Sequence, residues 1–214
     1  MKKLIEFILV GTFILSANIT KSEDETNNPD SSMEKSDVHH HKEEDQQIKE
    51  PTDYSIYNLR ATWLTQYNKE VRLNDLKGKV QVMAMFYSSC EYVCPRIVAD
   101  MKRIESEIDP NNRDKVGFVL VSIDPKRDTP QKLGTFGIEH DLDPKHWLLL
   151  HGDENDILEL SALLGVKYKR VGETDFAHSN LITVLNSEGE IVHQQIGLGT
   201  KHTETMTAIA KLIK

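Results

Sequence analysis

Two almost uninterrupted apolar runs constrain the fold of this chain more than any other feature of its sequence. Residues 80–87 read VQVMAMFY and residues 116–123 read VGFVLVSI, so neither run alternates between apolar and polar side chains. A strand that is apolar along its length is typical of a sheet covered on both faces. We therefore expect an α/β fold with a central sheet and helices packed on it.

The segments around these strands supply the helices. Residues 95–108 repeat apolar side chains at helical spacing, and Pro95 suits a first helical turn, where its missing N–H is not needed. A second helix is expected after the loop at residues 124–130, capped by Asp128 or Thr129. The remaining elements are expected as a short hairpin over 61–66 and 70–73, a strand over 147–150, a helix over 153–164, a hairpin over 180–185 and 190–196, and a closing helix over 203–213.

The N-terminal part of the chain differs from this domain in composition. Residues 1–17 begin with two lysines and end in an apolar segment of eleven residues, 7–17, which is short for a membrane-spanning helix and suits a signal-peptide core. We expect a signal peptide or a short membrane anchor there. Residues 18–53 contain no Phe, Trp or Tyr, so we expect a disordered acidic linker. One folded domain then occupies residues 54–214.

The charge of the chain lies mostly in that linker. Between residues 21 and 50 there are ten acidic residues and four lysines, a net charge of −6 out of −8 for the whole chain. The domain itself is therefore only mildly acidic. It shows no basic patch, which argues against nucleic acid as a partner.

Cys90 and Cys94 are the only cysteines of the chain, and they lie four positions apart between the first apolar run and the helix that follows. Two thiolates at this spacing can bind one soft metal ion such as Cu(I), or they can oxidise to a disulfide in an exported protein. The N–H groups and the dipole of the helix predict a lowered pKa for these thiols. A purely structural disulfide is disfavoured, because cross-linking so short a loop gains little stability.

A third metal ligand has to come from elsewhere in the chain. Nine histidines are available, and spacing alone does not choose among them. His178 stands out because it precedes the hairpin strand that begins at residue 180, in a loop that could fold over the cysteines. The residues His39–His41 could capture metal loosely, although a solvated tether is the simpler interpretation. His193 is expected to be exposed in mid-strand.

Four stretches of the chain resemble the Sco/SenC family of copper-binding, thioredoxin-like proteins that help to assemble cytochrome c oxidase. Residues 86–95, FYSSCEYVCP, match the C-x-x-x-C-P loop of that family, and residues 121–130, VSIDPKRDTP, match its S-[VI]-D-P-x-R-D-T-P signature. The other two stretches are residues 147–153 with 163–166, which resemble W-x-x-L-x-G-D and L-L-G-V, and His178-Ser179, which resembles D-H-S. The resemblance covers residues 53–214.

Two positions depart from the family pattern. Glu91 stands where a proline often follows the first cysteine, and Ala177 stands where an acidic residue often precedes the histidine. Neither change removes a ligand. Within the signature, the segment 124–130 is interpreted as a tight turn and helix cap, with Arg127 or Asp128 at a partner surface.

The resemblance implies a thioredoxin-like domain with a central mixed sheet, in which Cys90, Cys94 and His178 bind copper as Cu(I), Cu(II) or both. It implies a metallochaperone that delivers copper to, or matures, the dinuclear copper site of cytochrome c oxidase. The expected partner is the copper-site subunit of that oxidase or a similar exported copper protein. The expected location is the periplasm, or the outer face of the inner membrane if the N-terminal segment is retained as an anchor.

The same cysteines support a second function. Cys90 and Cys94 could act as the redox-active pair of a thiol–disulfide oxidoreductase that keeps a client's cysteines reduced, with electrons drawn from a thioredoxin-like reductant. The sequence shows no obvious acid–base machinery, which disfavours a turnover enzyme of another kind. A thiol peroxidase is disfavoured because Tyr87, rather than Ser or Thr, stands three residues before the first cysteine. A metal-sensing or redox-signalling role is also compatible with the sequence.

Overall fold

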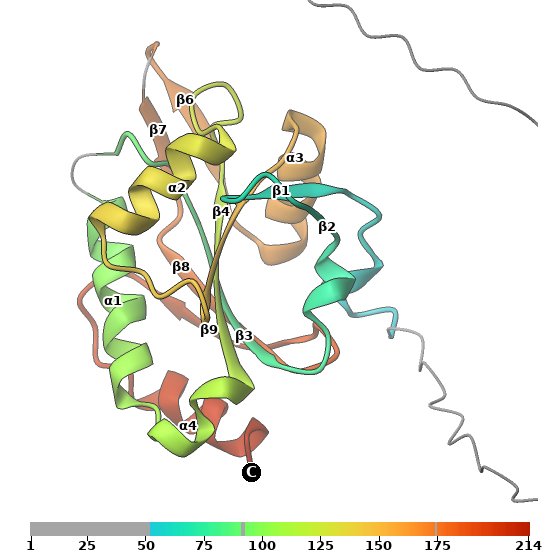
Figure 1. Cartoon of the computed structure of the whole chain (residues 1–214), viewed down its shortest axis with the longest axis vertical. Coiled ribbons are helices and arrows are strands. Elements are labelled where there is room, and N and C mark those ends of the chain that lie inside the picture. Colours follow the sequence, from blue (N-terminus) through green and yellow to red (C-terminus); the bar gives the residue numbers. More distant parts are fainter. Residues whose placement is uncertain (1–51, 91–92, 174) are drawn as a thin grey trace, which may run out of the picture. The chain divides into compact units, whose positions relative to one another are not determined.

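The structure, a computed structural model, describes residues 52–90, 93–173 and 175–214. Its strands are β1 (Trp63–Thr65), β2 (Glu70–Val71), β3 (Val80–Phe86), β4 (Val116–Ser122), β5 (Trp147–His151), β6 (Tyr168–Val171), β7 (Asp175–His178), β8 (Leu181–Leu185) and β9 (Ile191–Ile196). Its helices are α1 (Cys94–Glu107), α2 (Pro130–Glu139), α3 (Glu154–Leu164) and α4 (Thr203–Leu212), with short 3-10 helices at Ile56–Asn58, Leu73–Leu76 and Pro110–Lys115. Seven strands form one sheet in the order β2-β1-β5-β4-β3-β8-β9, and β6 and β7 form a second (Figure 1).

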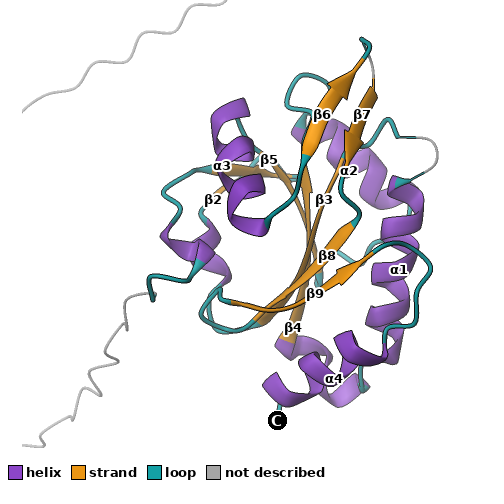
Figure 2. Cartoon of the chain, turned by 180° about the vertical axis from the view of Figure 1, so that it is seen from behind, coloured by secondary structure: helices purple, strands orange, loops and turns teal. Residues whose placement is uncertain are grey.

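The two apolar runs form the centre of the larger sheet. Strands β3 and β4 pair in parallel, β5 pairs in parallel with β4, and β8 pairs antiparallel with β3. Every residue of β3 is buried, because α1 and α2 lie on one face of the sheet and α3 lies on the other (Figures 1 and 2). The expectation of a mixed central sheet flanked by helices is confirmed.

Local sequence explains where two of these helices begin and end. The Thr129 hydroxyl accepts a hydrogen bond from the Lys132 N–H (3.3 Å) and caps α2. The Asp153 carboxylate accepts from two N–H groups in the first turn of α3 (2.9 Å each), and Gly165 ends that helix with φ +69°. The capping role expected of Thr129 is confirmed. The alternative cap, Asp128, is wrong, because its carboxylate is turned into the domain.

The hairpin β6–β7 was not expected from the sequence. It places His178 in a strand, paired with Tyr168, so the expectation that His178 lies in a loop is wrong. The two strands of the hairpin pair antiparallel. Phe176 attaches the hairpin to the rest of the domain by packing against Tyr87, with ring centroids 5.3 Å apart. The predicted hairpins that became β1–β2 and β8–β9 are confirmed.

The N-terminal predictions lie almost entirely outside the described residues. The signal peptide at 1–17 and the linker at 18–53, apart from its last two residues, therefore stay predictions. At the domain boundary, the Thr52 hydroxyl donates to the Glu190 carboxylate (2.5 Å). Within the described part of the chain, none of the helices combines the length and the apolar character that crossing a membrane requires.

Candidate metal and redox site

The cysteine loop connects the C-terminal end of β3 to the first residue of α1. Cys94 opens α1 and is completely buried, whereas Cys90 is partly exposed. The Cys90 sulfur accepts a hydrogen bond from the Cys94 N–H (3.4 Å), and the Cys94 sulfur accepts one from the Tyr87 N–H (3.4 Å). No disulfide joins the two cysteines. The first N–H of α1 thus bonds the partly exposed Cys90 sulfur, and the backbone directly after β3 bonds the buried Cys94 sulfur.

The hairpin β6–β7 brings His178 to the thiols from 84 positions away. The His178 Nε2 atom lies 3.7 Å from the Cys94 sulfur, and its Nδ1 atom lies 3.1 Å from the Ser179 carbonyl oxygen. A carbonyl oxygen only accepts, so Nδ1 carries the proton in the neutral ring and Nε2 presents its lone pair to the sulfur. In this tautomer Nε2 is available as a metal ligand.

Tyr87 holds the hairpin in this position. Its ring makes edge-on contacts with Phe176 and His178, at centroid distances of 5.3 and 6.0 Å. Its hydroxyl oxygen also accepts a hydrogen bond from the Phe176 N–H (3.4 Å). Tyr87 follows β3 directly, so it links the strand that carries the cysteines to the hairpin that carries the histidine.

Burial decides the protonation of this group in the metal-free protein. It raises the pKa of Cys94, and the hydrogen bond from the Tyr87 N–H opposes that change only in part. Burial also lowers the pKa of His178, and it raises the pKa of Tyr87 to about 12. The expectation that the helix dipole lowers the thiol pKa is therefore wrong for Cys94, because desolvation outweighs the dipole. Near neutral pH, a neutral thiol faces a neutral imidazole.

The predicted ligands are only partly assembled. Cys94 and His178 are in contact, and the Cys90 sulfur accepts a hydrogen bond from the backbone of Cys94. Among the described residues, no three His, Cys, Asp or Glu side chains converge closely enough to bind one metal ion. Other described histidines have other neighbours: His140 packs at a tilt against the Phe136 ring, His151 bonds the Asp128 carbonyl oxygen, His193 bonds Thr205, and His202 bonds Gln195.

Sequence reasoning missed the role of Asp128. This carboxylate is fully buried, accepts from the Ser88 N–H (2.9 Å) and from the Ser122 hydroxyl (2.6 Å), and is also bonded by the Ser88 hydroxyl. Asp128 is therefore neither a cap nor part of a partner surface. It ties the start of the cysteine loop to the end of β4. The available signal was the pair of serines placed directly after or within buried apolar strands, where each needs a polar partner.

The rest of the 124–130 loop reaches the hairpin. The buried Asp124 carboxylate pairs with Arg127, and Arg170 of β6 lies 3.8 Å away. The Arg170 guanidinium also lies over the Phe176 ring, 4.5 Å from its centroid. The signature segment thus supports both halves of the site, through Asp128 on the cysteine side and Asp124 on the histidine side.

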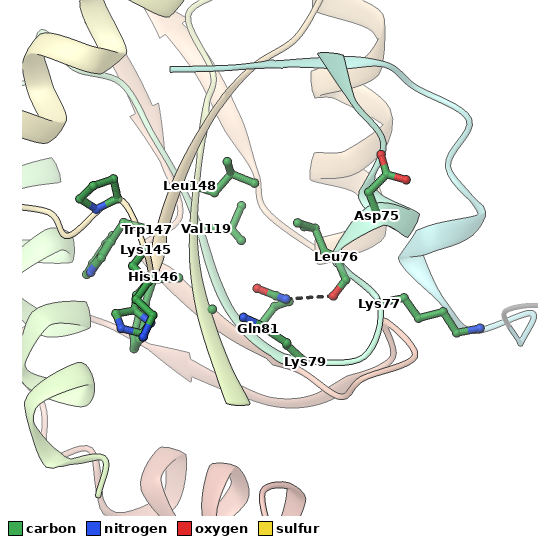
Figure 3. Close-up of a pocket in the computed structure, with 13 residues that line it drawn as sticks. Asp75, Leu76, Lys77, Lys79, Gln81, Val119, Lys145, His146, Trp147 and Leu148 are labelled. Carbon is green, nitrogen blue, oxygen red and sulfur yellow. Dashed lines mark hydrogen bonds between the residues drawn. The ribbon is translucent and has the colours of Figure 1, made fainter. Parts of the chain in front are cut away.

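Two pockets of the described residues lie away from the cysteines. A pocket of about 260 Å³ lies elsewhere, at the N-terminal ends of β3, β4 and β5 (Figure 3). In that pocket Gln81 points toward Leu76 and donates to its carbonyl oxygen (3.0 Å). Neither cysteine lines it, nor the pocket of about 370 Å³ between Ile123 and Phe176. The partly exposed sulfur suits exchange with a macromolecule more than turnover of an enclosed small molecule.

Comparison with known proteins agrees with the resemblance seen in the sequence. The family model SCO1/SenC matches residues 56–214. The SCO1 protein homolog of Bacillus subtilis is 29% identical over 156 residues, which cover 72% of this chain and 79% of that protein. The copper-bound structure of Bradyrhizobium japonicum ScoI is 26% identical with a TM-score of 0.58, over 71% of this chain and 96% of ScoI. The structure of a SCO1/SenC family lipoprotein from Bacillus anthracis has a TM-score of 0.67 at 24% identity, over 78% and 99% of the two chains, which supports the thioredoxin-like fold.

Proposed function

The chain belongs to the SCO1/SenC family, and on that premise we propose that it binds copper through Cys90, Cys94 and His178 and passes it to another exported protein. The observation that carries the proposal is the 3.7 Å approach of His178 Nε2 to the Cys94 sulfur. Two sulfur donors and one imidazole form a soft donor set, which suits Cu(I), and an added ligand would allow Cu(II). The copper bound to ScoI of Bradyrhizobium japonicum supports the choice of metal.

The protonation states of Cys94 and His178 determine what has to change when a cation binds. Binding requires the Cys94 thiol to lose its proton, which the buried position resists until a positive ion is present. His178 needs no such change, because its lowered pKa keeps Nε2 free of a proton near neutral pH. Binding also requires Cys90 to join Cys94 and His178 around the ion, because no three such side chains of the described residues converge closely enough without it. The partly exposed Cys90 then gives an incoming ligand of a partner a route to the ion.

The client we propose is the copper-site subunit of cytochrome c oxidase, or a similar exported copper protein. The support is the family resemblance, since Sco/SenC proteins help to assemble that oxidase. We place the domain outside the cytoplasmic membrane, in the periplasm or anchored to its outer face. The Bacillus anthracis relative, a lipoprotein, is consistent with an anchored domain.

A second candidate function is thiol–disulfide exchange with the same client, and the unequal exposure of the two cysteines favours it. The thiolate of Cys90 would attack the client disulfide, form a mixed disulfide and release one client thiolate. Cys94 would then attack Cys90 and release the second client thiol. The client gains two electrons, and the Cys90–Cys94 disulfide that forms has to be reduced by a thioredoxin-like donor.

Titration of the reduced protein with Cu(I) separates the two functions. We expect one copper per chain, no binding by Cys90→Ser/Cys94→Ser, and an affinity lowered about tenfold or more in His178→Ala. His193→Ala is the matched control, since this half-buried histidine of β9 bonds Thr205 of α4 and should leave the affinity unchanged. If His178→Ala binds copper as the wild type does while client disulfides are still reduced, thiol exchange replaces copper transfer as the function.

A further inference from the structure

The start of helix α4 lies in a pocket that nothing in the copper proposal uses. His202 occupies the N-cap position, and its side chain makes no capping hydrogen bond. The N–H of Met206 donates to the His202 carbonyl (2.8 Å), so the N–H groups of the three residues before it are not bonded within the helix. They point toward the loop between β9 and α4.

The pocket at this helix end has a volume of about 440 Å³ and is lined mainly by polar side chains. The lining side chains with polar groups that the argument uses are Gln195, Thr200, Lys201, Thr203, Thr205 and Glu204. One ammonium, an amide and several hydroxyls therefore accompany the free helical N–H groups. Glu204 is the one carboxylate among the residues that line it.

Gln195 gives independent evidence for a ligand. The residue is only 7% exposed, and its Oε1 atom accepts from the Thr205 hydroxyl (2.8 Å) and from His202 Nδ1 (2.9 Å). His193 Nε2 lies 3.1 Å from the Thr205 hydroxyl. Within the described residues, the buried Gln195 Nε2 has no hydrogen-bond partner. A buried donor left unpaired is costly, and an acceptor atom in the pocket would satisfy it.

We propose that this pocket binds a tetrahedral oxyanion of the phosphate class. The helix N-terminus, the Gln195 amide, the hydroxyls of Thr200 and Thr203, and Lys201 can all donate, and an oxyanion is the ligand that accepts from every one of them. The negative charge of Glu204 repels a bound oxyanion, so we expect a low affinity for phosphate. The site contains none of the residues proposed to bind copper, so it adds a function beyond copper transfer. The phosphate could be free or part of a headgroup or ester.

Titration of isotope-labelled, full-length protein with inorganic phosphate, followed by amide NMR at constant ionic strength, tests the proposal. We expect shifts at residues 199–205 with a millimolar dissociation constant. Lys201→Ala should weaken binding about fivefold, and Glu204→Gln should strengthen it by a similar factor, because the two changes remove charges of opposite sign. Lys211→Ala, an exposed lysine at the other end of the same helix, is the matched control and should bind as the wild type does.

Two arms of the titration identify the source of the anion. Binding of phosphate but not glycerol phosphate supports a site for the free anion, and binding of both supports a site for a headgroup or ester. The proposal is overturned if phosphate shifts these amides no more than chloride does, or if Lys211→Ala weakens binding as much as Lys201→Ala. All three substitutions are on exposed side chains, so folding is preserved. Cu(I) titration of the same variants reports separately on the copper site.

Discussion

Replacing Asp128 by alanine is expected to destabilise the domain and release the cysteine loop. The carboxylate accepts three hydrogen bonds, two from Ser88 and one from the Ser122 hydroxyl, and it is fully buried. Hydrogen bonds to a charged acceptor stabilise the folded state by about 1.5–3 kcal/mol each. Removing the buried carboxylate also removes the free energy that its burial costs, which offsets part of the loss. We therefore expect a loss of about 3–4 kcal/mol in the free energy of unfolding, and faster alkylation of Cys90.

Urea unfolding of the reduced protein measures the loss, and a double-mutant cycle assigns it. Ser122→Ala removes one of the three bonds and should cost about 1–2 kcal/mol, with a coupling to Asp128→Ala of about 1 kcal/mol. Asp100→Ala is the matched control. It removes another buried carboxylate, which accepts from the Gly199 N–H (2.8 Å), and should leave alkylation of Cys90 unchanged. The reasoning is refuted if Asp128→Ala unfolds within about 1 kcal/mol of wild type and Cys90 reacts at its normal rate.

Three further results are expected. Gly152→Ala should lower the melting temperature and reduce the free energy of unfolding by about 2 kcal/mol, because the new Cβ would lie 2.4 Å from the buried Trp63 ring. Gly137→Ala is the control and should not lower the melting temperature, because a Cβ at Gly137 has no neighbouring atom within 4 Å. Burial lowers the pKa of His178, so its contribution to stability is complete above about pH 6.5 and is lost as the pH falls through the lower folded pKa. Urea unfolding at pH 7.5 and pH 5 should therefore show a larger acid loss in wild type than in His178→Asn. Mass spectrometry after brief iodoacetamide treatment should find Cys90 modified at least about ten times faster than Cys94, and equal rates would contradict the burial of Cys94.

The central sheet was predictable because strands that are buried on both faces have almost continuously apolar sequences. The apolar runs at 80–87 and 116–123 became β3 and β4, and Thr129 and Gly165 marked helix ends through local hydrogen bonding. The sequence of the β6–β7 hairpin has no such apolar run. Its first strand reads YKRV and is mostly exposed, so its place depends on contacts with distant residues rather than on its own pattern.

The site was predictable in its residue types and less so in its chemistry. The cysteine spacing indicated a soft metal or a disulfide, whereas His178 could be chosen only through the family resemblance. The inward turn of Asp128 and the raised pKa of Cys94 both arise from burial, which depends on how the loops pack over one another. Sequence spacing alone contains no information on that packing.

The placement of the imidazole on a two-stranded sheet of its own has a kinetic consequence. Among the residues that the structure describes, the strands β6 and β7 pair only with each other, and most of their residues are exposed. The cysteines are attached to the buried seven-stranded sheet. Local opening of such a hairpin requires less free energy than global unfolding. An ion held between the two sheets would then have a residence time set by the opening rate of the hairpin, and hydrogen exchange at residues 168–178 would report that rate directly.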